Sequence, residues 1–206
     1  MLGTSDTRPV QMIAKAAFRG LREMDAHCPT GLCNYVSCSP YADKKRKDEP
    51  AITWGVTEAL RKRWQVAQCE HAYPAGRTRC DRVIELADDA RLWLEIKLAW
   101  RTWFYEVVKH NEPFMYNGYF HGQHKSHSVA GDFAKLERIG AAHARYVALL
   151  VVGFDGQDAK MAEDMASLVE REGLVNRGWR LLADSWRTQQ SEECWHRCWF
   201  AWRQAK

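Results

Sequence analysis

Apolar side chains recur at helical spacing in three long stretches of the chain. Residues 9–26 show the pattern most fully, because one helical face collects seven apolar positions: Val10, Ile13, Ala14, Ala17, Phe18, Leu21 and Met24. Similar faces predict helices over residues 129–143 and 158–172. A shorter helix is predicted over residues 57–64, with Thr57 as its N-terminal cap.

Other stretches have the pattern of strands. Three of them follow one another closely, at residues 65–73, 78–86 and 91–100. Residues 145–154 form a nearly unbroken apolar run, which is typical of a strand buried on both faces. The tail after residue 174 contains five tryptophans, and its spacing fits a helix or a short strand.

The order of these elements predicts the fold class. A helix, three strands, a helix, a strand and a helix indicate an α/β protein with a central mixed sheet flanked by helices. We expect residues 57–173 to form the core, preceded by a helix and a basic, cysteine-containing loop in residues 1–56. Within that part, residues 28–50 read as a loop. Residues 174–206 are expected to be a tryptophan-rich extension packed on the core.

Composition narrows the classes of protein that fit. A length of 206 residues suits one domain with a real core, and the net charge of +4 permits nucleic-acid binding without requiring it. No apolar run reaches membrane-spanning length, and residues 1–9 lack an apolar signal core, so we expect a cytoplasmic protein without a membrane partner. Seven cysteines without a CxxC spacing favour buried thiols over a disulfide framework or a structural metal.

The most informative chemistry lies on the second and third strands. Asp81 is followed fourteen positions later by Glu95-Ile96-Lys97. Glu95 and Lys97 share one face of the third strand, while its Leu and Ile residues share the other. Asp81 joins Glu95 on that face when the two are directly opposed. This register leaves a three-residue loop, Ala87–Asp89, whereas a two-residue turn would place Asp81 opposite Ile96, on the wrong face.

These residue types suit a hard divalent cation. Mg²⁺ prefers carboxylate and carbonyl oxygens together with water, so Asp81, Glu95 and the Ile96 carbonyl are the expected metal ligands. A metal ion there would polarise a phosphodiester and lower the pKa of a bound water. Lys97 would position that water or stabilise the developing charge. The alternative is that Glu95 and Lys97 are an ordinary exposed pair on a strand.

The hairpin and its surroundings resemble the PD-(D/E)xK nuclease superfamily, which has the restriction-endonuclease-like fold. The resemblance covers residues 57–154 and places Asp81, Glu95 and Lys97 on the family's motif, although Cys80 stands where a Pro often precedes the Asp. It implies an αβββαβ core and an Mg²⁺-dependent endonuclease, with Mn²⁺ able to substitute. The expected substrate is DNA.

The resemblance also implies further site residues. Many members carry another upstream acid, for which Glu70 is favoured over Glu58. The Asp132-x-x-Lys135 segment resembles the helix that follows the third strand in several members, so Lys135 is a candidate phosphate contact. Independently of the family, Arg101 and His124 lie in an aromatic- and histidine-rich stretch and are candidate nucleic-acid contacts.

Two other functions stay open at this point. The hairpin could be structural in a catalytically silent nucleic-acid-binding or accessory protein with the same fold. Alternatively, the tryptophan-rich tail could be an oligomer interface, with a homodimer as the simplest assembly. The sequence does not specify DNA or RNA, strandedness, sequence preference or mode of cleavage.

Overall fold

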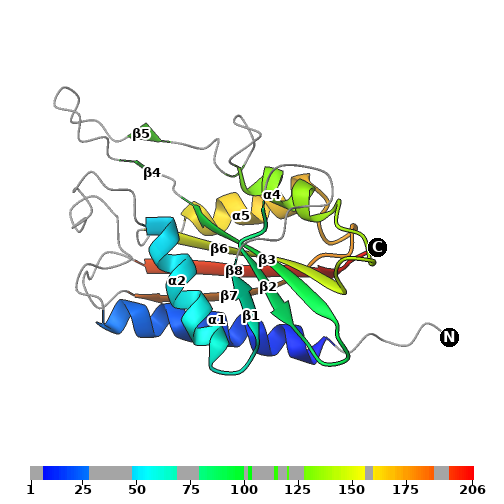
Figure 1. Cartoon of the computed structure of the whole chain (residues 1–206). Coiled ribbons are helices and arrows are strands. Elements are labelled where there is room, and N and C mark those ends of the chain that lie inside the picture. The colour runs from blue at the N-terminus through cyan, green and yellow to red at the C-terminus, as the bar shows by residue number, and fades with distance from the viewer. Residues whose placement is uncertain are drawn as a thin grey trace.

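The protein is an α/β structure built on a six-stranded mixed sheet with helices on both faces (Figure 1). The computed structural model describes residues 7–27, 48–68, 79–99, 102–103, 114–115, 120, 128–155, 160–187 and 195–206. The general fold class predicted from the order of elements is therefore confirmed.

The helices are α1 (Arg8–His27), α2 (Asp48–Arg61), α4 (Val129–Leu136) and α5 (Lys160–Arg171). The strands of the main sheet are β1 (Val66–Gln68), β2 (Arg82–Glu85), β3 (Arg91–Ala99), β6 (Tyr146–Asp155), β7 (Arg180–Arg187) and β8 (Trp195–Gln204). A separate pair consists of β4 (Thr102–Trp103) and β5 (Phe114–Met115).

The strand order in the main sheet is β1-β2-β3-β6-β8-β7. The first three strands are antiparallel neighbours, as in a meander. β6 then lies parallel to β3, and α4 belongs to the connection between them. β8 and β7 complete the sheet in antiparallel pairing. β3 and β6 are consequently interior strands, and most of their described side chains are buried, on both faces of the sheet.

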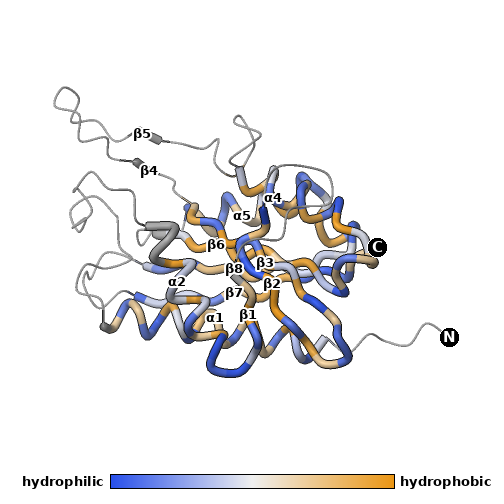
Figure 2. The backbone as a smooth tube through the Cα atoms, in the orientation of Figure 1, coloured by the Kyte–Doolittle hydropathy of each residue, from blue (hydrophilic) through white to orange (hydrophobic). Residues whose placement is uncertain are grey.

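Two apolar layers hold the sheet between the helices. The first packs α1 and α2 on one face, with Ile84, Leu94 and Leu150 among its members. The second packs α4 and α5 on the other face, with Val83, Leu149 and Phe133 among its members. Figure 2 shows the hydrophobic residues concentrated in the strands between these helices. The apolar run of β6 feeds both layers, as expected for a strand buried on both faces.

The start of α2 differs from the prediction. The helix begins at Asp48, inside the stretch expected to be a loop, and Thr57 is an interior residue. Ile52, Val56 and Leu60 follow at four-residue spacing and are all buried, so the apolar face begins before Thr57. The Thr57 hydroxyl donates to the Thr53 carbonyl at 2.5 Å, a bond to the preceding turn that replaces the expected capping role.

The helix predicted over residues 129–143 is also shorter than expected. α4 ends at Leu136, and the next backbone bonds, from Arg138 to Lys135 and from Ile139 to Leu136, span three residues. The chain therefore tightens into turns at this point. At the other end, Ser128 caps the helix by accepting a bond from the Gly131 N–H at 3.0 Å.

The tryptophan-rich tail adopts the strand alternative. β8 inserts between β6 and β7, so it is an interior strand of the same sheet. Trp202 faces the α1–α2 layer and Trp199 faces the α4–α5 layer. The three-residue spacing of Trp199 and Trp202, which also fits a helix, places the two side chains on opposite faces of the strand. Backbone pairing with the open edge of β6 favours the strand over the helix.

Candidate functional site

The β2–β3 hairpin has the register that the sequence predicts for a shared acidic site. Arg82 pairs with Leu94 and Val83 with Trp93, so the register extended by one position sets Asp81 opposite Glu95. The Leu86 N–H donates to the Ala90 carbonyl at 2.7 Å, which leaves Ala87–Asp89 as the three-residue loop. Asp88 and Asp89 both have positive φ, at 59° and 54°. The predicted odd-length loop is therefore confirmed.

Asp81 is fixed directly to the third strand. It lies one residue before β2, and its Oδ2 accepts a hydrogen bond from the Ile96 N–H at 2.8 Å. The N–H and C=O of one residue point to the same edge of an extended strand. The Ile96 carbonyl consequently points to the edge at which Asp81 lies. The side chain of Ile96 is buried in the α1–α2 layer and takes no part in this edge.

Glu95 and Lys97 lie on the face of β3 that α4 and α5 cover. The alternation of β3 places them with Trp93 and Ala99, which belong to that layer. Their neighbours on β6 are the buried Leu149 and Val151. Glu95 is itself buried and Lys97 is half-buried. A carboxylate with apolar neighbours needs a compensating charge or hydrogen bonds.

Lys135 of α4 supplies a charge to Glu95. Its Nζ lies 3.5 Å from Glu95 Oε1 and 2.5 Å from Asp132 Oδ1. Asp132 and Lys135 are three residues apart on α4, a spacing that brings side chains together on a helix. The structure thus brings together Glu95, which sequence analysis placed at the metal, and Lys135, which it placed at the phosphate.

The pKa of Lys135 is raised, although burial acts to lower it. The neighbouring carboxylates of Asp132 and Glu95 outweigh that burial by charge and hydrogen bonding. Asp132 is almost fully buried, and its Oδ2 has no hydrogen-bond partner among the residues that the structure describes. Asp132 is not among the site residues predicted from the sequence, and its three-residue spacing from Lys135 is the signal that points to it.

The remaining predicted site residues are not brought to this cluster by the described part of the chain. Glu58 lies on α2, in the helical layer on the opposite face, and forms an exposed ion pair with Arg61 at 2.8 Å. Glu70, Arg101 and His124 lie outside the described residues. The choice between Glu58 and Glu70 as the additional acid therefore stays a prediction.

The donor chemistry at β2–β3 fits a hard cation. It consists of two carboxylates and a backbone carbonyl, without thiol or imidazole, and Glu95 already attracts the ammonium of Lys135. Within the described ranges, no group of three or more His, Cys, Asp or Glu side chains is placed to hold a metal. Asp81, Glu95 and the Ile96 carbonyl would therefore be a sparse set that leaves positions for water and phosphate.

The two described cysteines are structural. Cys80 and Cys198 are buried free thiols, as expected from the cysteine spacing. The Cys80 thiol lies 3.2 Å from the Leu94 carbonyl and 3.3 Å from the Arg82 carbonyl, and it fastens the start of β2 to β3 next to Asp81. Burial raises the pKa of the Cys198 thiol well above its usual value, a direction that disfavours the reactive thiolate.

A second buried polar cluster lies on the α1–α2 side of the sheet. His196 Nε2 lies 3.1 Å from Asp25 Oδ1, and the Trp186 indole donates to Asp25 Oδ2 at 3.1 Å. The Trp186 ring stacks on the imidazole, and the Arg22 guanidinium lies over the Trp186 ring, 4.5 Å from its centroid. These side chains fasten α1 to β7 and β8. No sequence motif points to this cluster, because its members come from distant elements.

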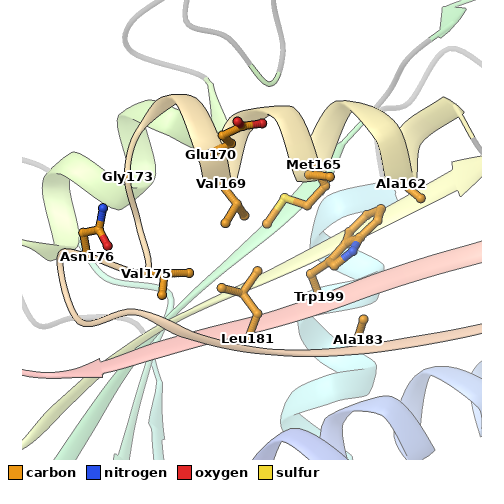
Figure 3. Close-up of a pocket in the computed structure, with 11 residues that line it drawn as sticks. Ala162, Met165, Val169, Glu170, Gly173, Val175, Asn176, Leu181, Ala183 and Trp199 are labelled. Atoms are coloured by element: carbon orange, nitrogen blue, oxygen red, sulfur yellow. The ribbon is translucent and has the colours of Figure 1, made fainter.

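An apolar groove runs between α5 and the β7–β8 edge of the sheet (Figure 3). Its volume is about 480 Å³. Met165 and Val169 of α5 face Trp199 and Leu181 across it. Trp199 pairs with Val151 of β6, which pairs in turn with Lys97 of β3. The groove therefore lies on the same face as Glu95, two strands away.

The comparisons with known proteins assign no relative. No family of known proteins matches this chain, and no similar curated protein or solved structure was found. In the part of the chain that the structure describes, no helix is long and apolar enough to cross a membrane. Fold and site together define an α/β protein in which acidic and basic side chains of β3 and α4 gather beside the start of β2.

Proposed function

We propose that this protein is an Mg²⁺-dependent nuclease with a restriction-endonuclease-like core. The observation that carries the proposal is the hydrogen bond from the Ile96 N–H to the Asp81 carboxylate, at 2.8 Å. It brings the predicted Asp to the backbone of the Glu95-x-Lys97 motif. The order α2, β1, β2, β3, α4 and β6, with β6 parallel to β3, supports the proposed core.

Each residue has a separate role in the proposed reaction. Asp81, Glu95 and the Ile96 carbonyl would hold the cation. The bound metal would polarise the scissile phosphate and acidify a water. Lys97 lies on the same face as Glu95, two residues along the strand, where its ammonium orients the attacking water or stabilises the developing negative charge. The net charge of +4 and the basic composition are compatible with DNA as the substrate.

The test is metal-dependent cleavage by matched variants of the hairpin. Purified protein is incubated with linear, circular and single-stranded DNA, in Mg²⁺, in Mn²⁺ or in EDTA. The Asp81→Asn variant retains a carbonyl oxygen that can accept the Ile96 N–H, so it removes the charge and preserves the hairpin. Asp88→Asn is the matched control, because it removes the same charge from an exposed loop position of the same hairpin.

We expect cleavage by the wild type and by Asp88→Asn, and none by Asp81→Asn. Cleavage that persists in Asp81→Asn would refute the assignment of the site. One observation favours the second candidate function, a silent nucleic-acid-binding protein, because Lys135 already neutralises part of the acidic charge. DNA binding that persists in EDTA, without cleavage under any condition, would support that alternative.

A further inference from the structure

The ammonium of Lys135 lies between two carboxylates of unequal burial. Its Nζ is 2.5 Å from Asp132 Oδ1 and 3.5 Å from Glu95 Oε1. The side chain of Asp132 is 2% exposed, that of Glu95 11% and that of Lys135 29%. Asp132 therefore makes the shorter and more buried contact, whereas the contact with Glu95 is at the long end of the hydrogen-bonding range.

The contact of Lys135 with Asp132 is held more firmly than its contact with Glu95. Asp132 sits in the first turn of α4, and its N–H donates to the Ser128 carbonyl at 3.0 Å. A buried carboxylate needs a nearby cation, and Lys135 is held one helical turn away. Asp132 thus holds the Lys135 ammonium close to α4, the helix that carries both residues. The contact of Lys135 with Glu95 on β3 is the one that another cation can replace.

A divalent cation and a lysine ammonium compete for the same carboxylate. Both neutralise Glu95, but Mg²⁺ requires direct oxygen ligation at short distance and carries twice the charge. We infer that Lys135 is the counter-cation of Glu95 in the metal-free protein. A metal that binds to Glu95 displaces the Lys135 ammonium, which keeps its contact with Asp132. This inference rests on the proposed function, because it takes Glu95 as a metal ligand. Lys135 and Asp132 are then positioning residues that set the metal affinity of the site.

Two substitutions of this pair have opposite expected effects. Lys135→Met combined with Asp132→Asn removes one positive and one negative charge, so the net charge of the cluster is unchanged and the competitor is gone. Mn²⁺ should bind this double variant about two- to fivefold more tightly, a range suited to the loss of a partly exposed ion pair. Asp132→Asn alone removes one of the two carboxylates that Lys135 contacts and leaves that of Glu95. Lys135 should then hold Glu95 more strongly, so Mn²⁺ should bind more weakly.

The measurement is Mn²⁺ binding by isothermal titration calorimetry, without nucleic acid, so it does not depend on catalysis. Lys160→Met combined with Glu163→Gln is the matched control, because these residues form an exposed lysine–acid pair at the same spacing on α5. Glu95→Gln, introduced into the wild type and the double variant, shows whether binding occurs at the proposed site. Thermal unfolding of each variant confirms that it is folded before titration.

Each outcome decides the inference. Tighter binding in the double variant and weaker binding in Asp132→Asn, both lost with Glu95→Gln, would support it. Glu95-dependent binding of equal affinity in the wild type and the double variant would overturn the inference and leave the proposed function standing. Absence of Mn²⁺ binding in every variant would overturn both. Binding that appears only in the double variant would support Lys135 as the competitor.

Discussion

Asp81 and Ile96 are joined by a hydrogen bond from the Ile96 N–H to the Asp81 carboxylate, at 2.8 Å. β2 begins only at Arg82, whose pairing with Leu94 is the last in the hairpin. The side chain of Asp81 therefore makes the next contact between the two chain segments in place of a backbone pair. The bond holds an acidic group at the strand edge to which the Ile96 carbonyl points. This relationship makes the hairpin a candidate site as well as a structural element.

The loop of the hairpin stores backbone strain that glycine would relieve. Asp89 has a φ of 54°, a conformation that costs most L-residues about 1–2 kcal/mol, costs Asp less and costs glycine little. We expect Asp89→Gly to raise the free energy of unfolding by up to about 1 kcal/mol and Asp89→Val to lower it. Urea denaturation of the two variants measures the difference. Equal stability of both variants would contradict the left-handed conformation at this position.

Lys97 should be required for cleavage and not for metal binding. It offers an ammonium, which cannot ligate a cation, on the face that it shares with Glu95. We expect Lys97→Met to lower the cleavage rate at least about a hundredfold, within the range for a positioned proton-transfer or electrostatic group. Mn²⁺ affinity measured by calorimetry should not fall. Cleavage at the wild-type rate would remove Lys97 from the mechanism.

Glu137 should stabilise the fold in a pH-dependent manner. It accepts hydrogen bonds from Arg177 and from the Trp179 indole, and it lies 3.4 Å from Arg203. Burial acts to raise its pKa, but these partners outweigh burial and hold the pKa below its usual 4.5. Their stabilising effect is therefore complete above the unfolded pKa and is lost as the pH falls through the lowered folded value.

We accordingly expect Glu137→Gln to reduce the free energy of unfolding at pH 7 by about 1–3 kcal/mol, as for hydrogen bonds to a charged group. The deficit should shrink as the pH falls below the usual 4.5 and through the lowered pKa of the folded state. Chemical denaturation across pH 3–7 measures both quantities. Glu172→Gln, also beside Arg177 but with a longer contact of 4.0 Å, is the control and should lose less. A deficit that is constant with pH would contradict the ionic role of Glu137.

The buried Asp25–His196 pair should be more costly to break than to replace. Both side chains are almost completely buried and lie 3.1 Å apart. Leaving one buried polar group without its partner costs about 1–3 kcal/mol, whereas apolar replacement of both partners can be nearly neutral. We expect Asp25→Leu to destabilise the protein more than the double variant Asp25→Leu with His196→Phe. A double variant that loses the sum of both single effects would contradict this coupling.

The local features of the site were predictable from the sequence. The alternation of residues 92–98 predicted which face of β3 carries Glu95 and Lys97, because side chains of a strand alternate with a period of two. The need to oppose Asp81 and Glu95 predicted the Ala87–Asp89 loop, which the Leu86–Ala90 bond confirms. Register and loop length constrain each other in a hairpin, so neighbouring residues carried enough information.

The contacts between distant elements were not predictable in the same way. Asp132 and Lys135 form a recognisable pair on a helix, but only the parallel pairing of β3 with β6 and the packing of α4 bring them to Glu95. Likewise, His196 contacts Asp25 because β8 packs against α1. Such contacts depend on which faces pack together, and the spacing of residues along the chain contains no record of that choice.

The sequence by itself determined the α/β class, the doubly buried β6 and the hairpin with its acidic register, because each follows from local periodicity and turn length. The tertiary structure decided that residues 195–204 form a strand between β6 and β7, since the open edge of β6 provides backbone partners on one side and two apolar layers accept the alternating side chains. It also decided that Lys135 of α4 is a counter-charge of Glu95. A buried carboxylate requires a compensating charge or hydrogen bonds, and the packing of α4 against β3 places this lysine within reach.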